Sequence, residues 1–250
     1  MSETRPWYED DSFWETWGPF MFSEERIKNT GVETDKVIRL LRMAPGARVL
    51  DLCCGIGRHS LELARRGFRV TGVDRTVNYL KRAKNQADAE KLDIEFVHED
   101  MRSFIRPETF DAVISLFTGF GYFEDIKDDK RVAANVYNSL KAGGRFIIDC
   151  HGKETLARVF QNRLWEEKDG AIHLQEQTIS QNWSWMQSRW ILIRGNERVE
   201  HTVSHRLYAA TELAALLTEC GFSRVDIYGD GDGSLYDHTA RRLVAVGSKK

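Results

Sequence analysis

A short apolar strand near the start of the chain carries an acidic residue, Asp51, at its end, and two glycines follow the strand. This arrangement suits the binding of a nucleotide-like ligand. Residues 49–52 form a mainly apolar strand, Gly55 and Gly57 open a turn, and residues 60–66 have the apolar spacing of a helix. Glycine can adopt a positive φ and lets a ligand lie against the backbone, while a helix N-terminus offers free N–H groups. The stretch therefore predicts the first βα unit of an open α/β sheet, with a ligand site at its turn.

A second acidic residue, Asp74, closes the next predicted strand at residues 68–73. In dinucleotide-binding folds an acid at this place accepts both hydroxyls of an adenosine ribose. Such a site suits either NAD or S-adenosylmethionine. Asp51, at the end of the first strand, favours S-adenosylmethionine. A carboxylate there would repel a pyrophosphate but attract the ammonium group of a methionine moiety. For an isolated aspartate, a solvated strand end or a turn cap would be the better explanation. We therefore expect S-adenosylmethionine as the cofactor and keep an NAD-linked oxidoreductase as an alternative.

The elements around this turn predict a Rossmann-like α/β fold, in which a seven-stranded, mainly parallel sheet has helices on both faces. The last two strands should form a hairpin, so that the final strand is antiparallel. The strands are expected at residues 49–52, 68–73, 94–97, 110–116, 145–148, 225–228 and 243–246. The helices are expected at residues 33–43, 60–66, 77–90, 130–140 and 211–220.

The composition of the chain changes on both sides of this core. Residues 1–36 are rich in aromatic side chains set among acids, and we interpret them as a cap. The core is predicted at residues 37–151 and 208–250, and residues 152–207 between them form an insertion. Its broken alternation predicts antiparallel strands at residues 174–180, 183–194 and 198–207. Because the insertion contains several tryptophans, we expect a lid over a substrate pocket or the interface of a homodimer.

Length and charge limit the classes of partner. The chain has 250 residues, 42% of them hydrophobic, which is enough for a sizeable core. A formal net charge of -2 favours neither nucleic acid nor an acidic membrane as a partner. With no long apolar run and a polar, acidic N-terminal stretch, we expect a soluble, cytoplasmic protein. The four cysteines have neither metal-ligand spacing nor a disulfide pattern, so we expect reduced thiols and no metal.

Five motifs follow one another along the predicted core: VLDLCCGIGRHS, VTGVDRT, FVHEDMRSF, FDAVISLFTGFGYF and LKAGGRFIID. Their order resembles that of the class I S-adenosylmethionine-dependent methyltransferases, in particular the branch that acts on small molecules. The resemblance covers residues 37–150 and, in topology, residues 208–249. It implies that Asp100 accepts the adenine amino group and that Met101 packs against the adenine ring. The usual first glycine of the turn is Cys53 here, and its side chain would narrow the space beside the methionine moiety.

Two further residues are expected beside the cofactor because of their place in the chain. Phe117 lies in the loop that leaves the fourth strand, and the carboxyl ends of parallel strands form the ligand crevice. Trp14 belongs to the aromatic cap, which either packs outside the core or covers the cofactor and presents aromatic faces to a cation. The predicted cofactor-binding residues are Asp51, Cys53, Gly55, Gly57, Asp74, Arg75, Asp100, Met101, Phe117 and Trp14.

Candidates for contact with the methyl acceptor lie in several parts of the chain. His151 follows the fifth strand on the crevice side, where an imidazole can take a proton from an amine or a hydroxyl. Tyr122 lies in the loop after the fourth strand. These two are the predicted catalytic residues, although both also suit ordinary core or surface roles. The predicted substrate contacts are Tyr8, Tyr208, Tyr236 and His238.

Together these features predict an S-adenosylmethionine-dependent methyltransferase that transfers a methyl group to a small molecule by in-line displacement. Nitrogen is preferred over oxygen or carbon as the acceptor, because the cap combines aromatic side chains with acids. The loop after the fourth strand lacks the Asn-Pro-Pro-Tyr type of sequence with which resembling enzymes methylate DNA bases or protein glutamine. An acceptor in RNA or at a peptide terminus, an NAD-linked oxidoreductase and a non-catalytic S-adenosylmethionine-binding protein are the alternatives.

Overall fold

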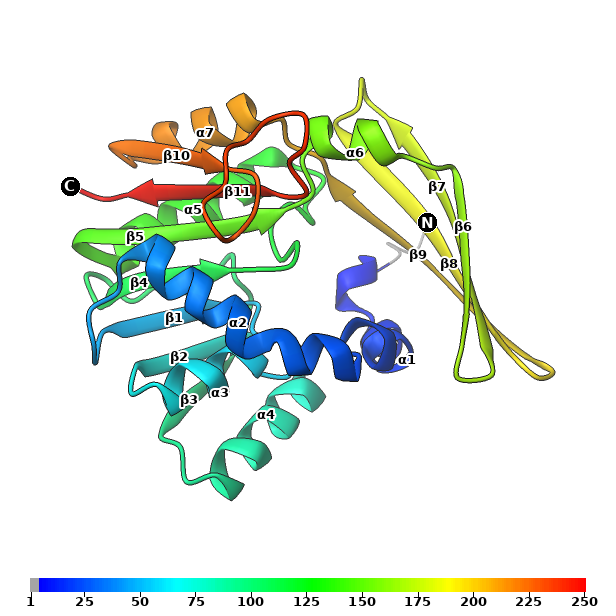
Figure 1. The fold of residues 1–250 in the computed structure, drawn as a ribbon, viewed down its shortest axis with the longest axis horizontal. Coiled ribbons are helices and arrows are strands. Elements are labelled where there is room, and N and C mark those ends of the chain that lie inside the picture. The colour runs from blue at the N-terminus through cyan, green and yellow to red at the C-terminus, as the bar shows by residue number, and fades with distance from the viewer. Residues whose placement is uncertain (1–4) are drawn as a thin grey trace.

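The computed structural model describes residues 5–250, which form two β-sheets (Figure 1). The larger sheet has seven strands in the order β10-β11-β5-β4-β1-β2-β3. They are β1 (Arg48–Leu52), β2 (Arg69–Asp74), β3 (Ile94–His98), β4 (Phe110–Ser115), β5 (Leu140–Cys150), β10 (Arg224–Tyr228) and β11 (Leu243–Ser248). Neighbouring strands are parallel except for β11, which is antiparallel to both β5 and β10. The predicted fold class is confirmed, including the closing antiparallel hairpin.

Helices cover both faces of this sheet (Figure 1). They are α2 (Glu24–Leu41), α3 (Arg58–Arg65), α4 (Val77–Ala89), α5 (Ile126–Ser139) and α7 (Ala210–Glu219). Successive side chains of a strand point to opposite faces. Leu50 therefore packs in the cluster that contains α5 and α7, whereas its neighbour Val49 packs with α2, α3 and α4. The sheet thus separates two hydrophobic cores.

Strands β1 and β4 lie side by side at the point where the strand order reverses. From β1 the chain continues to β2 and β3 on one side, whereas from β4 it continues to β5 on the other. At such a point the loops after the two strands diverge and leave a crevice outside the carboxyl ends of the strands. The loops that follow β1 and β4 therefore border the same space.

The insertion forms a second sheet of four antiparallel strands, which helix α6 (Lys153–Val159) joins to β5. Its strands, in sheet order, are β6 (Arg163–Lys168), β7 (Ala171–Ser180), β8 (Trp185–Arg194) and β9 (Glu197–Arg206). The sequence analysis found β7, β8 and β9 but missed β6. Every residue of β6 is exposed, so this strand has no apolar alternation by which to recognise it.

The N-terminal segment, with η1 (Trp7–Glu9) and α1 (Asp11–Met21), packs against the smaller sheet. Trp17 of α1 is fully buried in a cluster that includes Val203 of β9. The indole nitrogen of Trp17 donates to Nδ1 of His201 at 3.2 Å, and that of Trp7 donates to the carbonyl of Ser204 at 2.8 Å. The N-terminal segment and the insertion thus form one unit, which stands beside the core (Figure 1).

Helix α2 begins at Glu24 and crosses the predicted boundary between cap and core at residue 36. Its first turns are highly charged and carry no apolar stripe, so helical periodicity becomes visible only from residue 33 onward. The Ser23 side chain caps the helix by accepting a hydrogen bond from the backbone N–H of Arg26. Because α2 packs on α3, the core layer starts with α2 and the cap ends before it.

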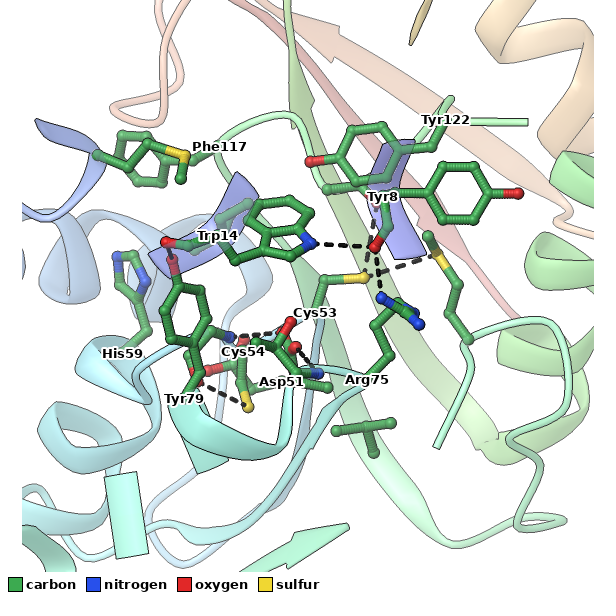
Figure 2. Close-up of a pocket in the computed structure, with 18 of the residues that line it drawn as sticks. Tyr8, Trp14, Asp51, Cys53, Cys54, His59, Arg75, Tyr79, Phe117 and Tyr122 are labelled. Atoms are coloured by element: carbon green, nitrogen blue, oxygen red, sulfur yellow. Dashed lines mark hydrogen bonds between the residues drawn. The ribbon is translucent and has the colours of Figure 1, made fainter. Parts of the chain in front are cut away.

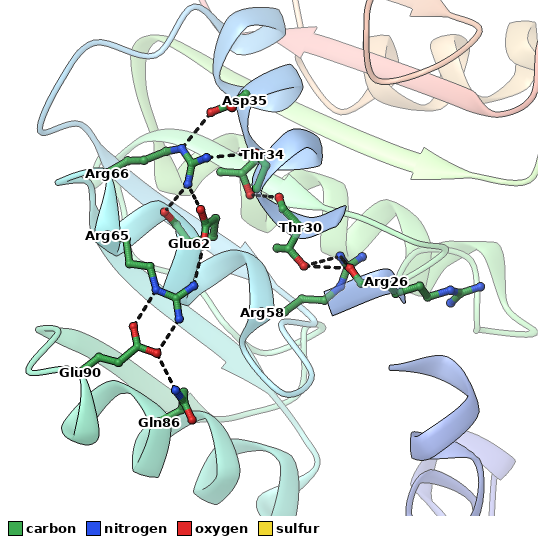
Figure 3. Close-up of polar contacts among 11 residues, drawn as sticks. Arg26, Thr30, Thr34, Asp35, Arg58, Glu62, Arg65, Arg66, Gln86 and Glu90 are labelled. Atoms are coloured by element: carbon green, nitrogen blue, oxygen red, sulfur yellow. Dashed lines mark hydrogen bonds and ion pairs between the residues drawn. The ribbon is translucent and has the colours of Figure 1, made fainter. Parts of the chain in front are cut away.

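Ion pairs connect α2, α3 and α4 on the outside of the core (Figure 3). Arg66 of α3 contacts Asp35 of α2 at 2.9 Å, and Arg65 contacts Glu90, which caps α4, at 2.5 Å. An exposed ion pair contributes about 0.2–1 kcal/mol. These contacts therefore orient the three helices more than they stabilise the fold.

Two surface features bear on the predicted partners. Across residues 5–250, no helix combines the length and the apolar character that crossing a membrane would need. On the edge strand β6, Trp165 is 71% exposed and Leu164 is 40% exposed. Unpaired edge strands can pair with another chain. A homodimer through the inserted strands stays a prediction.

Candidate active site

A pocket lies at the carboxyl ends of β1, β2 and β4, next to the N-terminal segment (Figure 2). This is the crevice that the strand order predicts. Its walls come from the segments that follow β1, β2, β3 and β4 and from η1, α1, α2, α3 and α4. The predicted cofactor residues that line it are Asp51, Cys53, Gly55, Asp74, Arg75, Asp100, Met101, Phe117 and Trp14. Of the acceptor candidates, Tyr8 and Tyr122 line the same pocket.

Positive φ angles shape the turn after β1, with 63° at Cys53, 56° at Gly55 and 73° at Gly57. Gly57 does not line the pocket. A Cβ at this position would lie 2.8 Å from Cβ of Ala83, so the glycine allows α3 to pack closely on α4. Gly57 therefore has a packing role, and its contact with the cofactor stays a prediction.

Cys53 adopts the left-handed conformation that glycine usually takes, which costs a residue with a side chain about 1–2 kcal/mol. Its Sγ lies 3.6 Å from Sδ of Met101 and 3.6 Å from the carbonyl oxygen of Gly119. A Cβ on Gly119 would come within 3.2 Å of Cβ of Cys53. The loop after β4 thus leaves room for the thiol that replaces the usual glycine.

Asp51 is a buried carboxylate, 4% exposed, at the end of β1. Burial raises its pKa, while the charges of His59 and Arg58 and a 2.6 Å hydrogen bond from the Ser60 hydroxyl act in the opposite direction. Among residues 5–250, no cation forms a salt bridge with Asp51. A buried carboxylate without a cationic partner is costly. The ammonium group of a methionine moiety would supply that partner, so the site fits S-adenosylmethionine.

Asp74 is held by two backbone N–H groups, which fix the direction of its carboxylate. Gly55 donates to Oδ2 and Thr76 donates to Oδ1, both at 2.8 Å. A carboxylate has about four acceptor positions, so two remain for the hydroxyls of a ribose. Asp74 therefore has the geometry that its predicted role requires.

Arg102, which the sequence analysis did not single out, binds the carboxylate of Asp100. Its Nη2 lies 2.7 Å from Oδ2 and its Nε lies 3.0 Å from Oδ1. Burial alone would raise the pKa of Asp100, but the hydrogen bonds and charge of Arg102 outweigh burial and lower it. Asp100 stays ionised, and Oδ2 keeps an acceptor position for an amino group.

The N-terminal segment places aromatic side chains over the pocket (Figure 2). The rings of Tyr8 and Tyr122 are stacked with their centroids 6.2 Å apart, and the indole of Trp14 donates to the carbonyl of Tyr8 at 3.0 Å. The guanidinium of Arg75 donates to the same carbonyl. Arg75 therefore lines the pocket and also holds the N-terminal segment against it.

Phe117 lies at the edge of the pocket between charged and polar groups. Its φ is 56°, and its backbone N–H donates to Oδ2 of Asp149 at 3.1 Å. The Arg58 guanidinium lies 4.2 Å from the ring centroid, and the His59 ring stacks on it at 5.6 Å. Arg58 and His59 both contact Glu33 of α2. Their position in the first helical turn after the glycines is the signal by which the sequence analysis could have identified them.

Two acceptor candidates near the fifth strand do not line the pocket. His151 contacts Arg242, with 3.0 Å between its Nε2 and Nη1 of the arginine. Desolvation and the charge of Arg242 lower the pKa of His151, although the residue is exposed. Tyr208 is buried, and its hydroxyl donates to Oδ2 of Asp129 at 2.6 Å. Tyr208 therefore belongs to the core, His151 lies outside the pocket, and the contact of either with an acceptor stays a prediction.

The other two candidates belong to the connection between β10 and β11, and neither lines the pocket. The hydroxyl of Tyr236 donates to Oε2 of Glu154 on α6 at 2.9 Å. The backbone carbonyl of His238 accepts a hydrogen bond from Arg158 on the same helix. The connection therefore follows α6, which corrects the prediction that it returns to the crevice.

Comparison with known proteins supports a methyltransferase. Residues 49–144 match a family model described as a methyltransferase domain. A putative methyltransferase of Geobacillus sp. (strain WCH70) is 25% identical, and the alignment covers 97% of each chain. The chain is an S-adenosylmethionine-dependent methyltransferase with the class I fold. The methyltransferase uses S-adenosylmethionine as its cofactor, and the NAD-linked oxidoreductase is set aside.

Two further similarities concern a solved structure with the same fold and an N-methyltransferase related over about half of its length. A crystal structure of an S-adenosylmethionine-dependent methyltransferase from Clostridium acetobutylicum ATCC 824 matches this methyltransferase with a TM-score of 0.78. It covers 96% of this chain and 98% of the other at 18% identity, so it shows the same fold. A glycine/sarcosine N-methyltransferase of Aphanothece halophytica is 33% identical over 56% of this chain and 52% of its own.

Proposed function

We propose that this methyltransferase transfers a methyl group from S-adenosylmethionine to the nitrogen of a small amine. The observation that carries the proposal is the aromatic wall of the pocket, formed by Tyr8, Trp14, Phe117 and Tyr122 (Figure 2). The face of an aromatic ring attracts cations and partial positive charge. Such a wall suits a sulfonium donor next to an amine.

The phenols in this wall favour nitrogen over oxygen as the acceptor. Burial raises the pKa of both Tyr8 and Tyr122 above 10.0, so both phenols stay protonated near neutral pH. A hydroxyl acceptor must lose its proton to a base as it attacks, and a protonated phenol cannot take that proton. A neutral amine attacks through its own lone pair and needs no base. The similarity to a glycine/sarcosine N-methyltransferase also supports nitrogen.

The residues of the pocket then have the task of aligning the reactants. When bound, S-adenosylmethionine supplies a methyl group that is bonded to a positively charged sulfur. This sulfur is the leaving group and becomes a neutral thioether. Asp51 would hold the ammonium group and Asp74 the ribose hydroxyls, while the aromatic wall places the amine in line with the methyl–sulfur bond. The nitrogen lone pair forms the new N–C bond as the C–S bond breaks. The methylated ammonium product then releases a proton to water.

The N-terminal segment favours a small acceptor over a macromolecule. The ring of Trp7 lies 4.9 Å from that of Tyr122, and the hydroxyl of Tyr79 donates to the carbonyl of Trp14. These contacts fix the segment over the pocket from both the loop after β4 and helix α4. A nucleic acid or a folded polypeptide would have to displace it, whereas a small amine would not.

A panel of acceptors tests the proposed function. It comprises small primary and secondary amines, phenols and alcohols, an RNA oligonucleotide and a short peptide. Release of S-adenosylhomocysteine is measured by mass spectrometry, with Asp51→Asn as the control for the donor site. We expect release with amines only, and much less with the variant. Release with phenols or RNA but with no amine would contradict the proposal, and donor binding without any release would indicate a non-catalytic protein.

A further inference from the structure

Two consecutive residues at the start of the loop after β4 adopt a backbone conformation that side chains disfavour. The φ angle is 56° at Phe117 and 64° at Thr118. A positive φ is uncommon for any residue except glycine, and it is a clear outlier for a bulky side chain such as phenylalanine or a β-branched one such as threonine. Such a conformation persists only where the surrounding structure holds it. The loop therefore depends on contacts from other segments.

Asp149, at the end of β5, supplies these contacts. Its Oδ2 accepts a hydrogen bond from the backbone N–H of Phe117 at 3.1 Å, and its backbone carbonyl accepts one from the N–H of Thr118 at 2.8 Å. Strand β5 is the parallel neighbour of β4, so its end reaches the first residues of the loop that leaves β4. Both N–H groups of the disfavoured pair are thus bonded to a single buried residue.

Arg242, which directly precedes β11, joins the carboxylate to the loop. Its Nε lies 2.7 Å from Oδ1 of Asp149, and its Nη2 donates to the hydroxyl oxygen of Thr118 at 3.2 Å. Its guanidinium carbon lies 6.0 Å from the centroid of the Phe117 ring. Because a guanidinium is a rigid planar fork, these contacts fix the carboxylate and the loop relative to each other.

The loop that is held in this way forms part of the methyl-donor pocket. Phe117 lines the pocket, whereas Asp149 and Arg242 do not. The Phe117 side chain is 40% exposed, which leaves ring surface for a ligand to cover. Arg58 and His59, which line the same pocket, pack on this ring. A change in the position of Phe117 would therefore change the wall of the donor pocket.

Asp111 provides a comparison, because it makes similar bonds at the other end of the sheet. It accepts a hydrogen bond from the backbone N–H of Arg48 at 2.8 Å and one from Nζ of Lys141 at 2.7 Å. Asp111 lies in β4 and Arg48 begins β1, so these contacts only join regular strands. Asp149 differs in that its backbone partners have a positive φ and that one of them lines the pocket.

We propose that Asp149, held by Arg242, is a positioning residue that fixes Phe117 against the bound methyl donor. Asp149 acts through Phe117 and does not itself touch the donor. A side chain that is already in place before the ligand arrives lowers the entropy cost of binding. The proposal concerns the donor alone and does not depend on which atom accepts the methyl group.

A double-mutant cycle tests whether Asp149 acts through Phe117. The affinity for S-adenosylhomocysteine is measured by calorimetry for Asp149→Asn, Phe117→Ala and the double variant. We expect Asp149→Asn to bind the ligand about tenfold more weakly than the wild type, and Phe117→Ala also to bind it more weakly. In the Phe117→Ala background, Asp149→Asn should change the affinity by no more than about twofold. A residue that only stabilised the fold would have the same effect in both backgrounds.

Substitutions of Thr118 test whether Asp149 acts by holding the backbone. Combined with Asp149→Asn, Thr118→Gly should restore the affinity about threefold, because glycine adopts a positive φ without a steric penalty. Thr118→Ala is the matched comparison, since it also loses the hydroxyl that Arg242 contacts but keeps the Cβ. It should restore nothing. Equal affinities of the two combined variants would contradict a role in holding this backbone.

Two further variants complete the test. Asp111→Asn is the control and should bind S-adenosylhomocysteine as the wild type does. If Asp149→Asn does not fold, as judged by denaturant titration, Arg242→Lys replaces it in the cycle, because lysine keeps the charge but loses the planar fork. Equal weakening with and without Phe117, or wild-type affinity in Phe117→Ala, would overturn the proposal. A loss that disappears in the Phe117→Ala background would support it.

Discussion

The hydroxyl of Ser60 donates a 2.6 Å hydrogen bond to Oδ2 of Asp51 and so joins the first turn of α3 to the end of β1. Both residues are buried. Burial raises the pKa of Asp51, whereas the charge of His59 and this hydrogen bond lower it. Ser60 therefore helps to keep Asp51 ionised, which is the state that attracts the ammonium group of the donor.

This relationship predicts how Ser60→Ala changes donor binding. Loss of the hydroxyl should raise the pKa of Asp51 further and weaken the binding of S-adenosylhomocysteine about tenfold. In both proteins the affinity should fall as the pH falls, because protonated Asp51 no longer attracts the ammonium group. The fall should begin at a higher pH in the variant. Calorimetric titration over a pH series measures this, and superimposable curves for the two proteins would exclude the role of Ser60.

Gly57 and Gly67 form a matched pair for the packing of α3 on α4. Both have a positive φ, 73° and 82°, but a Cβ on Gly57 would meet Ala83 at 2.8 Å whereas one on Gly67 would meet nothing within 4 Å. Gly67→Ala should lower the free energy of unfolding by about 1–2 kcal/mol through its backbone conformation alone. Gly57→Ala should cost a further 1–3 kcal/mol or so through overpacking. Denaturant titration measures the free energy of unfolding of both variants. Equal losses in Gly57→Ala and Gly67→Ala would refute the close approach of Gly57 to Ala83.

Asp129 predicts a pH dependence of stability. It is fully buried, and burial raises its pKa to about 6 despite the hydrogen bond from Tyr208 and the charge of Arg206. The folded state then binds more protons than the unfolded state between pH 3.8 and about 6. The contribution of Asp129 to the free energy of unfolding should therefore fall by about 3 kcal/mol as the pH rises through that window.

Asp129→Asn tests this contribution, because an amide oxygen can still accept the hydrogen bond from Tyr208 without titrating. We expect the free energy of unfolding of the variant to decrease less than that of the wild type between pH 4 and pH 6 or so. Denaturant titrations at several pH values measure both slopes. Parallel slopes would show that Asp129 titrates in the folded protein as it does in the unfolded chain.

The donor half of the pocket could be predicted from the sequence because its residues directly follow strands of recognisable pattern. Asp51, Asp74 and Asp100 each stand at or just after a strand end, and parallel strands bring those ends to one edge of the sheet. The same argument places Phe117. Local pattern and topology therefore determine this half of the site.

The contacts around this half could not be predicted, since they depend on packing between distant segments. Arg26 lies in helical turns without an apolar stripe, and Arg242 contacts Asp149 only because β11 pairs with β5. Tyr236 and His238 were placed at the crevice by topology alone, but their loop packs along α6. Such side-chain contacts between segments remote in sequence leave no periodicity to detect.

The most direct test of the donor site is a calorimetric titration with S-adenosylhomocysteine of the wild type, Asp51→Asn and Asp74→Asn. Asp88→Asn, at an exposed position on α4, serves as the control. We predict that each pocket variant binds the ligand at least about tenfold more weakly, because each loses charge-assisted hydrogen bonds, while the control binds as the wild type. Unchanged affinity in both Asp51→Asn and Asp74→Asn would contradict the assignment of this pocket to the methyl donor.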